Sequence, residues 1–95
     1  MNLDSWQGKP LVVDHYRNAD SEMIEHGISI EDVILVLEEG SVVTKRKKGI
    51  IEKWYQQGSQ VIIVAVEDYE DYWLIRHVGK IRATKSKLKL MRGDS

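Results

Sequence analysis

The feature that most constrains the fold of this chain is the uninterrupted apolar run Val61–Val66. Five of its six residues are β-branched, and such side chains favour strands because their restricted χ1 angles suit a pleated, packed surface. A run without polar alternation is typical of a strand buried on both faces. Turn-like segments at 57–59 and 67–71 flank the run, which predicts the central strand of a sheet.

Three further segments are predicted to be strands of the same sheet. Ile50–Gln56 and Tyr72–Val78 show strand-like alternation, and Val42–Thr44 is a short apolar run before a basic, turn-like stretch. Because their connections are all short, these segments predict an antiparallel meander of four strands. Leu11–Val13 is interpreted either as a first strand or as a segment that packs under the sheet.

Two helices are predicted ahead of this sheet. The first covers His15–Glu25 and stops at Gly27, a residue that suits a helix C-terminus. The second begins after Ser29, an effective N-cap with an acidic residue three positions later, and stops at Gly40. Apolar residues recur in it at helical spacing, at positions 30, 33, 34 and 37. The predicted fold class is therefore α+β.

Length and composition indicate one domain with no metal or cofactor. Its 95 residues suit a single domain over 1–95, with a core over 11–79 and a basic tail over 80–95 that is compatible with an edge strand, a short helix or a loose arm. The chain has no cysteine, and its histidines, His15, His26 and His77, lack the spacing of a metal site. No membrane-spanning run and no signal-peptide pattern is present, so we expect a soluble, cytoplasmic protein.

Charge is distributed unevenly along the chain. Residues 1–40 carry nine acids and two bases, a formal charge of −7, whereas residues 41–95 carry twelve bases and six acids, a formal charge of +6. The basic half favours a polyanionic partner such as RNA. The alternative is that the acidic helices complement the basic sheet and tail within one molecule.

A family resemblance rests on His15, on the link HGISIEDV from His26 to Val33, on VLEEG from Val36 to Gly40, and on the central strand. These residues resemble a family of short RelE-like proteins of unknown function, which is related to the BrnT-type ribonuclease toxins through the shared HGIS link. The resemblance covers about residues 11–79. It departs from the BrnT pattern at the C-terminus, where no clear arginine-rich helix follows the sheet.

The resemblance implies two N-terminal helices packed on a four-stranded antiparallel sheet, and a toxin-type endoribonuclease that works without metal. It also implies RNA as substrate and a cognate antitoxin protein as partner. Such cleavage needs an acid or base and a cation that holds phosphate. The candidate catalytic residues are His15, Lys53, Arg76 and His77. Because Arg76 and His77 are adjacent in a strand, they are expected to point to opposite faces.

Basic and aromatic residues of the second half are candidates for nucleic-acid binding, since cations attract phosphates and aromatic rings stack on bases. These candidates are Lys45, Arg46, Lys47, Lys48, Tyr55, Lys80 and Arg82.

Structural alternatives stand beside each functional interpretation. The histidines are compatible with packing or local hydrogen bonding, and Lys45–Lys48 with a solvated hairpin tip. A non-catalytic module that binds a protein or a nucleic acid on the same scaffold is the alternative to an enzyme. A homodimer joined through an edge strand, or through Leu88 and Leu90 of the tail, is a third interpretation.

Overall fold

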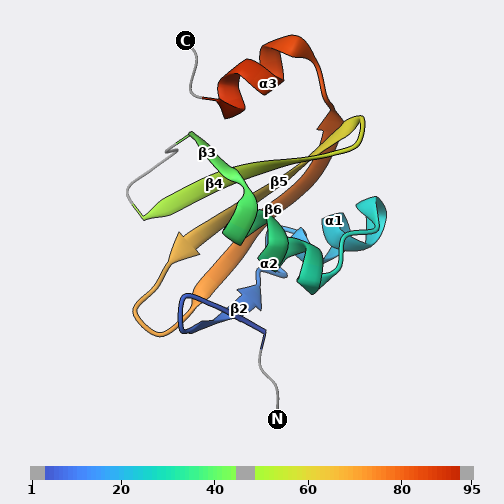
Figure 1. Cartoon of the computed structure of the whole chain (residues 1–95). Helices are drawn as coiled ribbons and strands as arrows, with labels where there is room; N and C mark the ends of the chain where they lie inside the picture. The colour runs from blue at the N-terminus through green and yellow to red at the C-terminus, as the bar shows by residue number, and fades with distance from the viewer. Residues whose placement is uncertain (1–3, 45–48, 93–95) are drawn as a thin grey trace.

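The computed structural model describes residues 4–44 and 49–92 (Figure 1). Within these residues the strands form one six-stranded sheet in the order β1-β2-β6-β5-β4-β3. The α+β class is confirmed, but the prediction of four strands and two helices is not. In chain order the elements are β1 (Ser5–Trp6), β2 (Lys9–Val13), α1 (Ala19–His26), α2 (Ile30–Glu39), β3 (Ser41–Thr44), β4 (Ile50–Gln57), β5 (Gln60–Asp68), β6 (Trp73–Arg82) and α3 (Lys85–Met91).

The central strand is confirmed. β5 lies between β4 and β6 and is antiparallel to both, and all six residues from Val61 to Val66 are buried. Alternate residues serve different faces of the sheet. Ile62, Val64 and Val66 join helix residues in the main core, whereas Val61, Ile63 and Ala65 are buried outside that cluster.

Helix α2 confirms the second predicted helix, including its start. The Ser29 hydroxyl accepts a hydrogen bond from the Asp32 backbone N–H at 3.1 Å, and the Asp32 carboxylate accepts one from the Ser29 N–H at 2.9 Å. This reciprocal capping box satisfies two amides that the first turn leaves unpaired. The buried side chains of the helix are Val33, Val36 and Leu37, which pack against the sheet.

Helix α1 starts later than predicted, at Ala19 rather than His15. The buried carboxylate of Asp14 accepts hydrogen bonds from the backbone N–H groups of Tyr16 and Arg17, at 2.9 and 3.3 Å. These bonds fold residues 15–18 into a turn, as short acidic side chains often do. The predicted end is confirmed, since Gly27 has φ 65° and closes the helix.

The N-terminal segment changes the sheet from the predicted antiparallel meander to a mixed sheet. β1 and β2 form a hairpin, and β2 pairs in parallel with β6, with Leu11 opposite Trp73 and Val13 opposite Ile75. Two helices and three strands separate β2 from β6, and parallel pairing requires such a long crossover. The indole of Trp73 donates to the Trp6 carbonyl at 3.0 Å, which fixes the hairpin to the core.

The C-terminal segment is more ordered than a tail. β6 continues to Arg82, so residues 80–82 belong to the sheet, and α3 follows after Thr84, whose hydroxyl accepts from the Lys87 N–H at 3.3 Å. Of the alternatives for residues 80–95, the short helix is the one found for 85–91. Figure 1 shows α3 beside β3, at the end of the molecule away from β2.

Candidate functional site

Lys53, a predicted catalytic residue, has a structural partner. Its ammonium donates to the Leu37 carbonyl at 2.6 Å and lies 5.2 Å from the centre of the Trp6 ring. Leu37 is in the last turn of α2, where backbone carbonyls lack partners within the helix. Lys53 therefore ties the end of α2 to β4, and its ammonium is directed at that backbone rather than at an open surface.

Arg76 and His77 lie at a break in the sheet register. Ala65 is opposite His77 and Val66 is opposite Ile75, so Arg76 is the extra residue of a β-bulge. The prediction that Arg76 and His77 point to opposite faces assumed a regular strand, and the bulge interrupts the regular alternation of side chains at Arg76. Arg76 donates to the Glu67 carboxylate at 2.7 Å, because β5 extends further into the predicted acidic turn than expected.

His77 is bound to helix α1. Its Nδ1 lies 3.1 Å from Oε1 of Glu22, and the same oxygen accepts the Val78 backbone N–H at 3.0 Å. β2 pairs with β6 only as far as Ile75, so Glu22 takes the place of a neighbouring strand at Val78. His77 and Arg76 thus contact different carboxylates and do not converge with Lys53 on one site.

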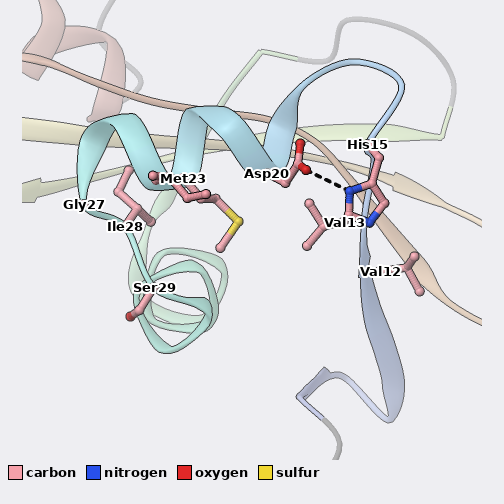
Figure 2. Close-up of a pocket in the computed structure, with 9 residues that line it drawn as sticks. Val12, Val13, His15, Asp20, Met23, Gly27, Ile28 and Ser29 are labelled. Carbon is pink, nitrogen blue, oxygen red and sulfur yellow. Dashed lines mark hydrogen bonds and ion pairs between the residues drawn. The ribbon is translucent and has the colours of Figure 1, made fainter.

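His15 has a different environment, in the turn before α1 (Figure 2). Its Nδ1 lies 2.8 Å from the Asp20 carboxylate, and its side chain is 75% exposed. The hydrogen bond from His15 lowers the pKa of Asp20, and the Ser21 backbone N–H lowers it further. Among the described residues, Nε2 of His15 has no hydrogen-bond partner. His15 therefore keeps one ring nitrogen accessible to a ligand.

An apolar groove of about 610 Å³ opens beside this pair, between β2 and α1 (Figure 2). His15 and Asp20 lie at one end of the groove, and Gly27, Ile28 and Ser29 at the other. The groove is lined by Val12, Val13, His15, Asp20, Met23, Ile24, Gly27, Ile28 and Ser29.

Apart from Lys53 and Arg92, the lysines and arginines of the described residues fall into two groups. Lys9, Arg17 and Arg76 each pair with a carboxylate, those of Asp68, Asp14 and Glu67 respectively. The second group runs along the end of β6 and through α3, and none of its members has a carboxylate partner within the described part of the chain. Its members are Lys80, Arg82, Lys85, Lys87 and Lys89.

The sheet register brings three of the predicted nucleic-acid-binding residues together. Tyr55 is opposite Ile62, which is opposite Lys80, so both side chains lie on the same face of the sheet. Strands about 4.8 Å apart place the Tyr55 and Lys80 backbones about 10 Å from each other. Arg82 lies one pair further along that face, and the half-buried Tyr55 ring packs against the edge of the core. We name Tyr55, Lys80 and Arg82 the basic sheet end.

Helix α3 carries lysines that were not among the binding residues predicted from the sequence, because the sequence was compatible with three structures for residues 80–95. Lys85 and Lys87 lie in its first turn, which carries no acidic residue. Cations there oppose the helix dipole, so they do not stabilise the helix. These lysines, with Lys89, extend the uncompensated charge beyond the basic sheet end. The predicted binding residues Lys45–Lys48 lie outside the described residues.

Two structural features are absent from residues 4–44 and 49–92. No group of three His, Cys, Asp or Glu side chains is arranged to hold a metal ion. No helix in these ranges has the length and apolar character needed to cross a membrane. Comparison of the chain with protein-family models, with curated proteins and with solved structures finds no match.

Proposed function

We propose that the protein binds single-stranded RNA through the basic sheet end and the lysines of α3, on a RelE-like scaffold. The observation that carries this proposal is the segregation of charge. Lys9, Arg17 and Arg76 are paired with carboxylates, whereas the five successive cations from Lys80 to Lys89 have no carboxylate partner in residues 4–44 and 49–92. Clustered like charges repel one another, and a polyanion relieves that repulsion while releasing its own counterions.

The residue types of this surface fit an unpaired strand. Lysine and arginine contact phosphates without reading sequence, and the half-buried Tyr55 presents a ring on which a base can stack. Stacking on a side chain requires an unpaired base, so a single strand suits this surface better than a duplex. The order of two helices followed by β3, β4, β5 and β6 supports the RelE-like scaffold.

The test compares RNA affinity between charge variants by fluorescence anisotropy with a labelled single-stranded oligoribonucleotide. Lys80→Gln and Arg82→Gln should each weaken binding roughly tenfold at 50 mM salt, from a slope of about 0.7 per phosphate contact. Arg17→Gln removes the same charge from a paired site and should leave the affinity unchanged. Equal affinity of the Lys80/Arg82 double variant and the parent protein would refute the assignment, as would tighter binding to duplex DNA.

A second candidate function, RNA cleavage without metal, is favoured by the His15–Asp20 pair. If Nδ1 donates its proton to Asp20, the lone pair of Nε2 is free to accept the proton of a 2′-hydroxyl. The 2′-oxygen then attacks phosphorus and the bond from phosphorus to the 5′-oxygen breaks. The 5′-oxygen takes up a proton, and the products are a 2′,3′-cyclic phosphate and a 5′-hydroxyl.

Cleavage and binding are separated by one pair of variants. His15→Ala should abolish the appearance of cyclic-phosphate ends while leaving RNA affinity intact. His26→Ala, a histidine in the last turn of α1, is the matched control and should cleave normally. Cleavage at the same rate by the parent protein and His15→Ala would exclude His15 as the base. Binding without any cleavage by the parent protein would leave the binding module as the function.

A further inference from the structure

Two surfaces at separate places in the molecule are complementary in polarity and charge. One is the apolar groove between β2 and α1, and the other is helix α3 (Figures 1 and 2). The residues of the basic sheet end belong to neither surface. Both surfaces leave apolar side chains in contact with water.

The groove is bordered by strongly exposed apolar side chains. Ile24 is 83% exposed and Val12 is 44% exposed, and both line the groove. Contiguous exposed apolar surface of this kind marks sites of protein–protein contact. The helix that forms one wall is acidic, since Asp20 lines the groove and Glu25 is exposed on the same helix. A partner for this groove therefore needs apolar side chains accompanied by positive charge.

Helix α3 has both the apolar side chains and the positive charge that such a partner needs. Its sequence, KSKLKLM, carries three lysines and no acid, and it contains no buried residue although Leu88, Leu90 and Met91 are apolar. Leu90 is 48% exposed. A helix of seven residues is marginal in water by itself, because nucleation is unfavourable and tertiary packing supplies most helical stability. An external partner that covers its apolar side would stabilise it.

We propose that α3 of one copy docks into the groove of a second copy of this chain. An α3 helix cannot reach the groove of its own molecule, because only residues 83 and 84 separate it from β6 and the Ala83 N–H donates to the Ser59 carbonyl at 2.9 Å. Leu90 enters beside Ile24, and the lysines of α3 face the acids of α1. The two contact surfaces differ, so the association is head-to-tail and extends into open chains unless it closes into a ring.

This contact shares the lysines of α3 with the proposed RNA surface, but the two proposals can be tested separately. Lys80 and Arg82 lie on β6, outside both docking surfaces. A neutral change at Leu90 therefore alters self-association and spares the basic sheet end, whereas charge changes at Lys80 and Arg82 alter RNA affinity alone. Failure of either proposal leaves the other testable.

Sedimentation velocity of the full chain, from micromolar to millimolar concentration, tests the proposal. The parent protein should sediment faster as concentration rises, and added salt should weaken that trend because opposite charges are screened. Ile24→Ser removes the groove contact and Leu90→Ser removes the helix contact, so each variant should stay monomeric. Tyr69→Ser, at an aromatic side chain that is 39% exposed and belongs neither to the groove lining nor to α3, should behave like the parent.

Mixing the two defective variants gives the sharpest outcome. Ile24→Ser keeps an intact α3 and Leu90→Ser keeps an intact groove, so an equimolar mixture should form a heterodimer and grow no further. Recovery of association in the mixture also shows that both variants are folded. A parent protein that is monomeric throughout, or a mixture that stays monomeric while the parent associates, would overturn the head-to-tail contact.

Discussion

At the scale of single residues, Glu22 holds α1 against the edge of β6. One of its carboxylate oxygens accepts both from the Val78 backbone N–H and, at 3.1 Å, from the His77 ring. In the part of the chain that the structure describes, this edge has no strand partner beyond Ile75, and an unpaired backbone amide there would otherwise rely on water. A side chain from a helix thus completes the hydrogen bonding of a strand.

Replacing Glu22 should reveal how much this contact contributes. Glu22→Ala removes a charged acceptor from two donors, and we expect the free energy of unfolding to fall by about 2 kcal/mol. Glu25→Ala, an exposed acid on the same helix, should change it by no more than about 0.5 kcal/mol. Urea denaturation measures both. Equal unfolding midpoints for the two variants would show that Glu22 has no special role.

The His15–Asp20 pair makes a prediction about pH. The hydrogen bond from His15 lowers the pKa of Asp20 below its ordinary value of 3.8. A carboxyl whose pKa is lower in the folded state contributes stability that is complete above the unfolded pKa and is lost as pH falls through the folded pKa. The contribution of Asp20 should therefore be present at neutral pH and disappear only in acid, below pH 3.8.

An NMR titration of the Asp20 side-chain carboxyl checks this assignment. His15→Ala should raise the pKa of Asp20 toward its ordinary value, while the Ser21 N–H, 2.9 Å from the carboxylate, continues to lower it. His26→Ala should leave that pKa where it is. An Asp20 pKa unaffected by His15→Ala would mean that the pair does not form in solution.

At the scale of elements, Gly40 shows how tightly α2 and β4 approach. Its φ of −76° is open to any residue, so backbone conformation is not the reason for a glycine. A Cβ at this position would collide with the Val36 carbonyl oxygen and would lie 2.9 Å from the Trp54 carbonyl oxygen. Both neighbours are backbone atoms, which cannot rotate away.

Gly40→Ala should therefore destabilise the protein by about 2 kcal/mol or more, since overpacking against fixed atoms forces the backbone to shift. Gly79→Ala is the control. The nearest atom to a Cβ there is Nε2 of the His77 side chain, at 3.4 Å, and this ring can adjust. Thermal unfolding of the two variants compares them. Equal melting temperatures would contradict the close approach.

Elements governed by local pattern could be predicted from the sequence. The Val61–Val66 strand and the capped helix after Ser29 depend on apolar spacing and on side chains near in sequence, and both are confirmed. The parallel pairing of β2 could not be predicted, because it joins Leu11 to Trp73 across most of the chain. The turn at Asp14 was missed because a buried acid competes there with helix formation.

The candidate site likewise combines features that could be predicted from the sequence with features that could not. Tyr55, Lys80 and Arg82 were named from the sequence for their aromatic or basic character but not as neighbours, because residues 80–82 were assigned to the tail, and only the register of the sheet brings Tyr55 and Lys80 to one row. The partners of Lys53, Arg76 and His77 were not found, because each bond joins segments distant in sequence or depends on the bulge at Arg76. The lysines of α3 were missed because a seven-residue helix gives little periodic signal.

At the scale of the whole molecule, charge is separated between two regions. Half of the acids among the described residues lie on α1 and α2, and five lysines and arginines without a carboxylate partner in that part of the chain lie on the end of β6 and on α3. The ion pairs of Lys9, Arg17 and Arg76 do not join the acidic helices to the basic half, because Arg17 pairs with Asp14 within the first half and Arg76 with Glu67 within the second, while Lys9 of the first half pairs with Asp68 of the second. The cations of residues 80–89 have no carboxylate partner among the described residues, so these contacts do not support mutual neutralisation of the two halves, and a polyanionic partner at that end is favoured.

The most direct test of this account is the salt dependence of RNA binding. Each phosphate contact with a single strand contributes about 0.7 to the slope of log affinity against log salt concentration. Replacing Lys80 and Arg82 together by glutamine should therefore reduce the magnitude of the slope by about 1.4. A slope that is the same for the double variant and the parent protein would contradict RNA binding at the basic sheet end.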